Sequence, residues 1–420
     1  MSTSFAHLKL SPGLAKEEEF LVRLSRLDLH PGHGPALKKL AEADLNWARV
    51  LILAEREGLA DLALFNLIRP GGRDLAPRIF LETLAQVRAE PRAMTRAQIQ
   101  AGLEAILALQ DAQLEVIALK GLALALLYYP EPLARPMSDT DLLVRESDLE
   151  RADSVFTELG YKPVDASIRE ARLNPPGTLA SVDMRRENAP HVSVHLHWHL
   201  VNSSVSARHM VDRVNLDGIW SETKKKQVEH NNNLISLTEL APHHFLLHLA
   251  EHCLRPGHGI DRLVLLADLD RILAGFGDDL DWSLTVREAR AWGWEDSLYL
   301  TLSAAKALYL VDIPEEVLHE LKPAHPGWGT RYFKKALLSN KRRRGLSVLF
   351  HFSLQKKAGH KIMFLLRILF PPASILIQRR GGSGEKPNIT LYLRRYLEII
   401  SFLFNNINPL ARRHRKARPQ

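Results

Sequence analysis

Two aspartates separated by a single residue are the side chains in this sequence best suited to chemistry. Asp139 and Asp141 follow a proline-rich turn and lead into the apolar residues Leu142–Val144. On an extended backbone, residues two apart project from the same face, so both carboxylates point the same way. Paired hard oxygen ligands, with no cysteine beside them, suit Mg²⁺ that bridges nucleotide phosphates. Taken alone, the pair has a competing interpretation as an ordinary turn followed by the start of a strand.

The residues upstream of this pair are typical of a phosphate-binding turn. A short apolar strand is expected over 115–119, and a small-residue helix is expected over 122–129. Gly121 stands between them, where a residue without a side chain lets backbone N–H groups approach a phosphate at the positive end of a helix. Lys120 and Arg135 can neutralise phosphate charge, and a guanidinium can grip a phosphate through two parallel hydrogen bonds.

A third segment, residues 191–200, alternates strictly between apolar and polar residues. This period of two predicts a half-buried strand. The polar face would carry four histidines and a serine: His191, Ser193, His195, His197 and His199.

Taken in order, these motifs resemble a known family. LKG at 119–121, YYP at 128–130, RPMSDTDLLV at 135–144 and HLHW at 195–198 are similar to motifs of the DNA polymerase β type of nucleotidyltransferase. Within that superfamily, the nearest match is a group of uncharacterised bacterial nucleotidyltransferases, and the resemblance covers residues 40–310. It implies that a nucleoside monophosphate is moved from an NTP to an unidentified acceptor hydroxyl or amine, with Mg²⁺ or Mn²⁺ on Asp139 and Asp141.

The resemblance also implies roles for individual residues. The catalytic set would be Asp139, Asp141, His195 and His197. The nucleotide would contact Lys120, Gly121, Arg135 and Ser138.

The sequence departs from the family pattern at His195, where relatives carry an acid two positions before the His-Trp pair. Imidazole binds Mg²⁺ poorly compared with a carboxylate. Three interpretations follow: His195 binds a softer ion such as Mn²⁺, Asp183 or Glu187 supplies the missing acid, or catalysis is lost. In the last case the chain would be a nucleotide-binding scaffold.

Two zinc sites are alternative interpretations of the histidines. His195, His197 and His199 alternate on one strand face, as ligands in some zinc enzymes do. The segment 248–252 reads H-x-x-E-H, the pattern of inverted zinc proteases, and His244 extends the same helical face. The sequence offers no clear partner acid for this second site.

Composition is that of an ordinary globular protein of two or three domains. The chain has 420 residues, of which 46% are hydrophobic and 25% charged. A single cysteine excludes a disulfide framework and fits a reducing compartment. No export signal and no apolar run of membrane-spanning length is visible, so we expect a cytoplasmic protein.

Charge is distributed unevenly along the chain. Residues 341–420 hold 18 Lys and Arg against two acids, whereas the remaining residues hold 38 against 46. A basic extension on an acidic body predicts a polyanionic partner, such as an anionic membrane surface at the inner face of the membrane or a nucleic acid. The alternative is a solvated tail without a partner.

The expected fold is α+β, with a small mixed-sheet nucleotidyltransferase core embedded in predominantly helical regions. In the core, Thr95 and Gln98 are expected to cap the start of a helix. The competing interpretation is an all-helical binding protein in which residues 115–144 form only a βα turn. The predicted divisions are a helical region at 1–95, the core at 96–230, a helical bundle at 231–335 and a basic amphipathic extension at 336–420.

Overall fold

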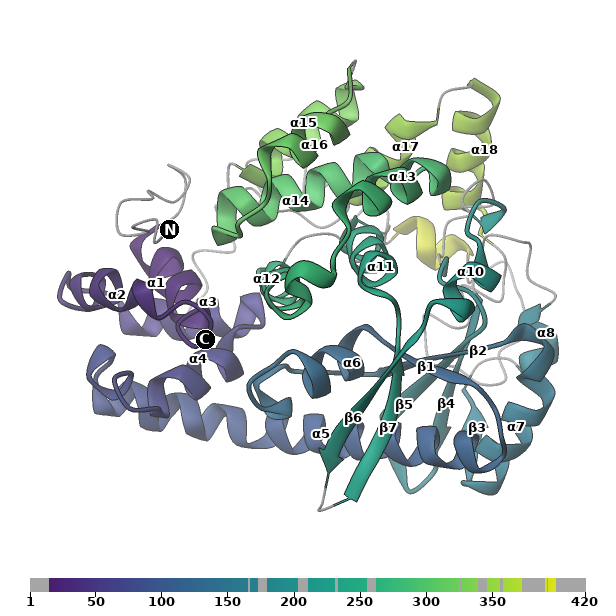
Figure 1. Ribbon diagram of the computed structural model, residues 1–420, viewed down its shortest axis with the longest axis horizontal. Coiled ribbons are helices and arrows are strands. Elements are labelled where there is room, and N and C mark those ends of the chain that lie inside the picture. Colours follow the sequence, from purple (N-terminus) through teal and green to yellow (C-terminus); the bar gives the residue numbers. More distant parts are fainter. Residues whose placement is uncertain are drawn as a thin grey trace.

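The computed structural model combines one five-stranded sheet with many helices (Figure 1). It describes residues 15–164, 167–172, 180–202, 211–230, 233–254, 262–324, 326–338, 346–355, 358–371, 390 and 392–397. The fold class is therefore α+β, as predicted, and the sheet rules out the all-helical alternative.

The central sheet has the strand order β1-β2-β5-β4-β3. It is mixed, because β2 and β5 run parallel while the other neighbours run antiparallel. The predicted strand at 191–200 lies beside the predicted strand that carries Asp141. The strands are β1 (Val116–Leu119), β2 (Thr140–Val144), β3 (Tyr161–Pro163), β4 (Ser181–Arg186) and β5 (Ala189–His197).

The prediction of a half-buried β5 was wrong. Its apolar face is buried as expected, but Ser193 and His197 on the polar face are buried as well. These buried polar side chains find partners inside the protein, because Ser193 Oγ donates to Asp183 and His197 contacts Asp141.

Helix α5 (Arg78–Asp111) holds the two strands that carry the predicted site residues. Gly102 lies so close to β2 that a Cβ would stand 2.8 Å from the Thr140 side chain. Gln98 Nε2 donates to Thr140 Oγ1 in β2 at 3.0 Å, and its Oε1 accepts from the Ser193 N–H in β5 at 3.2 Å. The predicted cap at Thr95 and Gln98 was wrong, because both residues lie inside this helix.

The helices before α5 form a core of their own around Phe20, Trp47 and Phe80. The predicted boundary between residues 95 and 96 lies inside α5, so the domain divisions remain a prediction. These N-terminal elements are α1 (Lys16–Ser25), η2 (Pro31–His33), α2 (Gly34–Ala41), α3 (Trp47–Glu57), α4 (Ala60–Ile68) and η3 (Arg73–Leu75).

Short helices connect and flank the strands of the sheet. They are α6 (Lys120–Leu127), η4 (Pro132–Ala134), η5 (Glu146–Asp148), α7 (Leu149–Glu158), α8 (Ile168–Arg172) and α10 (Leu216–Ser221). A hairpin of β6 (Lys224–His230) and β7 (Asn233–Glu239) then leads to the second helical region. The sequence had predicted a helical bundle over 231–335, but the first part of this range is strand β7, which continues to Glu239.

Buried ion pairs join the second helical region to the residues that directly follow α1. Arg26 donates two hydrogen bonds to Asp270 at 2.8 and 2.9 Å, and Arg271 pairs with Asp28 at 2.8 Å. The elements are α11 (Pro242–Leu254), α12 (Val264–Phe276), η6 (Gly277–Asp279), α13 (Trp282–Trp292), α14 (Glu295–Tyr309), α15 (Glu315–Leu321), α16 (Trp328–Leu338), α17 (Leu346–Leu354) and α18 (Ala358–Leu369). Among the described residues, none of the helices has both the length and the apolar character needed to cross a membrane.

Candidate active site

A row of side chains runs across three strands of the sheet. In the strand register, Asp141 of β2 stands opposite His195 of β5, and His195 stands opposite Asp183 of β4. Residues directly opposite each other point to the same face of a sheet, and His197 follows two residues after His195 on that face. The fold therefore brings the predicted catalytic residues Asp141 and His197 close to His195. It also brings Asp183, one of the two acids predicted to replace the missing one, to the other side of His195.

Three carboxylates surround the imidazole of His195. Its Nδ1 atom lies 3.6 Å from Asp139 Oδ2 and 3.6 Å from Asp141 Oδ1. Its Nε2 atom lies 3.8 Å from Asp183 Oδ1. Burial alone would lower the pKa of His195, but Asp141, Asp139 and Asp183 outweigh burial and raise it. The imidazole is therefore held in a strongly negative environment.

Asp141 is the most heavily engaged of the three acids. Its Oδ1 atom lies 3.0 Å from Lys120 Nζ and 2.6 Å from His197 Nε2. Burial favours the neutral carboxyl, but the Lys120 ammonium and the hydrogen bonds from His195 and His197 hold the pKa of Asp141 well below its usual value. Asp141 is thus an ionised, buried carboxylate at neutral pH.

His197 stays uncharged beside this carboxylate. Burial, together with the positive charges on Lys120 and His195, lowers its pKa to about 4 although Asp141 acts to raise it. The neutral ring donates its Nε2 proton to Asp141, although the position of that proton is inferred from the short contact. His197 therefore orients the carboxylate, and its imidazole adds no charge to the site.

Asp139 differs from Asp141 in being accessible. Its side chain is 42% exposed, whereas that of Asp141 is 7% exposed. Ser138 Oγ lies 3.4 Å from Asp139 Oδ1, at the exposed rim of the site. A ligand from solvent can therefore reach Asp139 without displacing protein contacts.

Asp183 is held by its own neighbours. Its Oδ1 atom accepts a hydrogen bond from Ser193 Oγ at 2.6 Å, and its Oδ2 atom accepts one from Arg185 Nη2 at 2.8 Å. Glu187, the other acid considered from the sequence, is exposed and pairs with Lys162 at 2.6 Å. Of the two candidates for the missing acid, the structure brings only Asp183 to His195.

Lys120 and Gly121 are the first two residues of α6, where the chain turns directly after β1. Lys120 has a φ of 39°, in the left-handed region that residues with a side chain rarely adopt, and its buried amine points back to Asp141. A Cβ on Gly121 would stand 3.0 Å from Arg135 Nη1 and 3.0 Å from Met137 Sδ. The sequence indicated the glycine and the lysine, but not that the lysine pairs with Asp141.

Arg135 is buried next to this turn and has an internal partner. Its Nη2 atom lies 2.9 Å from Asp268 Oδ2 in α12, and its Nη1 atom donates to the Pro136 carbonyl at 3.0 Å. Tyr129 also donates to Asp268, at 2.7 Å. The sequence did not indicate a role for Asp268, because its pattern does not distinguish a buried acid in a helix from one on the exposed face. The predicted contact between Arg135 and phosphate remains a prediction.

The histidines outside this row do not join it. The Nδ1 atom of His199 accepts a hydrogen bond from the Val201 N–H at 2.9 Å, and burial lowers its pKa to about 4. Among the described residues, the groups with the spacing of metal ligands include His195 and His197 but not His199, His248 or His252. Both zinc interpretations of the sequence thus lose members of their proposed ligand sets.

Comparison with known proteins assigns the chain to a family. A family model described as an uncharacterised nucleotidyltransferase matches residues 43–309, which is more than half of the chain and contains the whole row. The chain belongs to this nucleotidyltransferase family. No curated protein matches the chain. The resemblance to this family that was noted from the sequence is therefore confirmed. Nucleotidyl transfer is the class of activity that the family indicates.

Proposed function

We propose that the chain transfers a nucleoside monophosphate from an NTP to an acceptor hydroxyl or amine. The observation that supports this most strongly is the convergence of Asp139, Asp141 and Asp183 on His195, each within 3.8 Å of the imidazole. The acceptor stays open between a protein side chain, an RNA end, a sugar and a small molecule.

The donor set fits a hard divalent cation. Carboxylate oxygens are the ligands that Mg²⁺ and Mn²⁺ prefer, and Asp141 is ionised at neutral pH. Asp139 and Asp141 would hold the ion, with Asp183 as the third acid in place of the one that relatives carry at position 195. Such an ion neutralises triphosphate charge and stabilises the attacking and leaving oxygens.

The chain's own residues would position the nucleotide around this centre. The turn at Lys120 and Gly121 presents the N-terminus of α6, where backbone N–H groups and the helix dipole favour a phosphate. Lys120 adds positive charge beside Asp141, and Ser138 lies at the rim. Arg135 stands against Gly121, within reach of a group bound at that turn.

The reaction is a single displacement at the α-phosphorus. The acceptor oxygen or nitrogen forms a bond to the α-phosphorus while the bond to the bridging oxygen breaks and pyrophosphate leaves. The acceptor's proton must pass to a base, and Asp183 is well placed because its carboxylate lies beside His195 on the face of the sheet that carries Asp141.

The direct test is incubation of the full-length chain with each NTP, labelled at the α-phosphate, with Mg²⁺ or Mn²⁺. Label transferred to the chain itself, or to candidate acceptors of the four kinds, together with release of pyrophosphate, is the expected result. NTP binding without any labelled product, under all these conditions, would contradict the proposed transfer.

A second candidate is a nucleotide-binding scaffold without catalysis. The observation that favours it is that two of the acids already have cationic partners: Lys120 pairs with Asp141, and Arg185 pairs with Asp183. A site neutralised in this way has less need of a cation. The same assay separates the two, because a scaffold binds NTP with little dependence on the divalent ion and releases no pyrophosphate.

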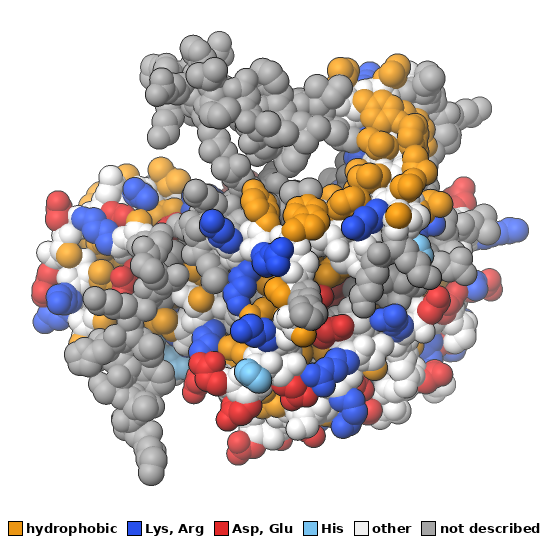
Figure 2. All heavy atoms as spheres, turned by 90° about the horizontal axis from the view of Figure 1, so that it is seen from above, with side chains coloured by type: hydrophobic (Ala, Val, Ile, Leu, Met, Phe, Trp, Pro, Cys, Tyr) orange, Lys and Arg blue, Asp and Glu red, His pale blue; other side chains and the backbone are white. Residues whose placement is uncertain are grey.

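We also propose that the basic extension docks on an anionic membrane surface. Helix α18 carries exposed apolar side chains together with Lys361 and Arg367; the apolar ones are Ile362, Met363, Leu365, Leu366, Leu369 and, just after the helix, Phe370. Figure 2 shows hydrophobic side chains gathered on the face where α18 lies, with Lys and Arg beside them. Basic charge next to exposed apolar area is the pattern of helices that lie in a membrane interface.

A further inference from the structure

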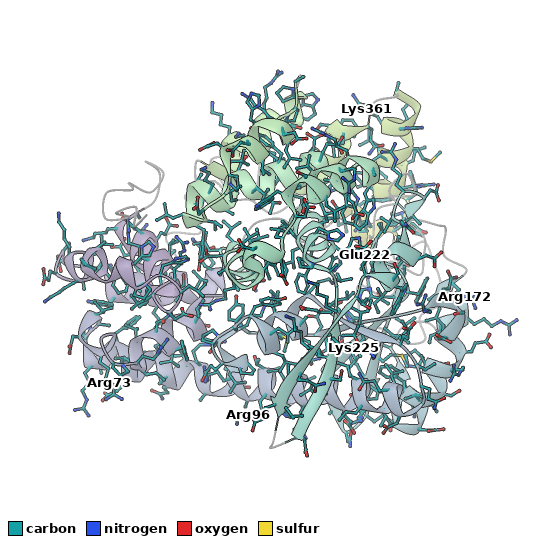
Figure 3. The ribbon with its side chains drawn as sticks, viewed as in Figure 1. Arg73, Arg96, Arg172, Glu222, Lys225 and Lys361 are labelled. Carbon is teal, nitrogen blue, oxygen red and sulfur yellow. The ribbon has the colours of Figure 1, made fainter. Side chains whose placement is uncertain are left out.

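A second group of ionisable side chains meets where three helices come together. His243 and His244 lie in the first turn of α11, Glu222 follows directly after α10, and Glu288 lies in the middle of α13. Figure 3 labels Glu222 beside α11, in the interior of the view. None of these residues belongs to the row around His195, and only His244 was noted in the sequence, with His248 and His252 rather than with these partners.

Glu222, His243 and His244 can each place one ligand atom within 4.8 Å of the others, which is the spacing of metal ligands, and Glu288 lies beside both histidines. His243 Nε2 lies 3.2 Å from Glu222 Oε2 and 3.6 Å from Glu288 Oε2, and His244 Nε2 lies 2.9 Å from Glu288 Oε2. Ligand atoms at the corners of a tetrahedron around Zn²⁺, with bonds near 2.0 Å, stand about 3.3 Å apart. The three separations lie on both sides of that value.

The buried polar atoms of this group also lack ordinary partners. Both imidazoles are more than nine-tenths buried. Within the described part of the chain, His243 Nε2 and Glu288 Oε2 make no hydrogen bond. The 2.9 Å contact between His244 and Glu288 therefore lacks the orientation of a hydrogen bond, as expected of two ligands that point at a third, common position. Unpaired buried polar atoms are costly, so a ligand that satisfies them is favoured.

The surroundings prepare these groups for a cation. The His244 ring stacks on Trp292 at 5.4 Å with an interplanar angle of 10°, which fixes its plane.

We propose that His243, His244, Glu222 and Glu288 bind one Zn²⁺ ion that fastens α10 to α11 and α13. Two imidazoles with two carboxylates favour Zn²⁺ over Mg²⁺, which prefers oxygen ligands alone. Four protein ligands complete a tetrahedral shell, as in structural zinc sites, so the ion stabilises the junction between the sheet region and the helical bundle. The site stands whether or not the proposed transfer occurs.

The test measures zinc binding to the full-length, metal-free protein in competition with a chromophoric chelator. Wild type should bind about one Zn²⁺ tightly at this site, and Co²⁺ in its place should give the intense visible absorption of a tetrahedral complex. Glu222→Gln and His243→Ala should each weaken this binding by at least about tenfold, since even residues behind metal ligands have effects of that size.

Controls keep the result specific. His319→Ala removes an exposed histidine on α15 and should leave zinc binding unchanged. Zinc bound near His195 and His197 would persist in Glu222→Gln, so only the ion lost in this variant counts. Glu222 is 46% exposed, and its isosteric change should not disturb folding, which circular dichroism checks. The same zinc affinity in wild type and Glu222→Gln, or no tetrahedral Co²⁺ spectrum, would reduce the group to an ordinary ion-pair network.

Discussion

Asp183 stands directly opposite His195 in the antiparallel pairing of β4 and β5, with 3.8 Å between Asp183 Oδ1 and His195 Nε2. An acid on the neighbouring strand thus lies beside the position where the resemblance noted from the sequence implies an acid. Asp183 can reach this position from β4, because opposite residues on a sheet share a face.

If Asp183 is the third acid, Asp183→Asn should lower nucleotidyl transfer by at least about tenfold, the effect seen when groups that support a metal are removed. Glu187→Gln, at the exposed end of the same hairpin, is the matched control and should leave transfer unchanged. Steady-state pyrophosphate release measures both. Full activity in Asp183→Asn would show that Asp183 is not the third acid.

The change His195→Asp should raise Mg²⁺ affinity. It restores the acid of the family pattern among Asp139, Asp141 and Asp183, where a fourth negative charge has no counterion until a cation binds. The metal-free variant should consequently be less stable than wild type, and added Mg²⁺ should recover that stability in thermal unfolding. His195→Asn, which adds no charge, should show neither effect. Weaker Mg²⁺ binding in His195→Asp would show that the imidazole has a role of its own.

Asp139 and Asp141 should respond differently to the same change. Asp139→Asn alters an exposed side chain and should abolish metal-dependent NTP binding at nearly unchanged stability. Asp141→Asn also leaves the buried Lys120 without its partner, so it should cost roughly 3 kcal/mol of unfolding free energy. Urea unfolding and isothermal titration with NTP separate the two effects.

Adding Lys120→Met to Asp141→Asn removes the unpaired buried charge and should recover part of the lost stability without restoring NTP binding. If Asp139→Asn retained full metal-dependent binding and transfer, the assignment of this site would be wrong.

A buried histidine far from this site should make stability depend on pH. Burial and the charges of Arg26 and Arg23 lower the pKa of His33 to about 4. Because the folded-state pKa lies below the unfolded value of about 6.5, the neutral ring stabilises the fold above that value. This contribution is lost as the pH falls from about 6.5 to about 4. His33→Gln keeps a side chain that can accept from Arg23 but cannot titrate, so its loss of stability over this window should be smaller than that of wild type. Equal pH profiles in urea unfolding would contradict this.

How far the sequence predicted this site depends on the kind of contact involved. The strands that carry Asp141 and His195 were predicted because apolar runs, a period of two and turn residues are local signals. Their parallel pairing depends on distant groups such as Gln98 of α5, which bonds to both strands and which local pattern had assigned to a helix cap. The position of Lys120 in the sequence indicated a phosphate ligand. Its pairing with Asp141 could not be predicted, because that contact depends on the tertiary structure. Of the group around His243, the sequence indicated only His244, because the members of the group come from three separate segments of the chain.

The last prediction concerns the exposed apolar surface of α18. Residues 341–420 carry 18 Lys and Arg, and each basic residue close to an anionic surface contributes about 1 kcal/mol at most, so a few that engage together with the apolar side chains give measurable binding. We expect the full-length chain to bind vesicles containing phosphatidylserine, and we expect this binding to weaken as salt is added.

The structure also decides where to truncate the chain. Cutting after Asn340, as the charge distribution alone suggested, would remove α17, whose Phe350 is fully buried and whose His351 contacts the Leu254 carbonyl at 3.0 Å. Truncation after Gln355 keeps α17 and removes α18, so the rest should remain folded and lose vesicle binding.

A double variant tests the contribution of α18 within the full-length chain. Ile362 and Phe370 are 59% and 60% exposed, so Ile362→Glu with Phe370→Glu should abolish vesicle binding while leaving unfolding unchanged. Ile52→Glu alters a side chain of comparable exposure on α3 and should leave vesicle binding unchanged. Cosedimentation with phosphatidylserine and with neutral vesicles measures all of them. Equal binding by the full-length and truncated chains, or binding that persists in the double variant, would show that α18 is not the docking surface.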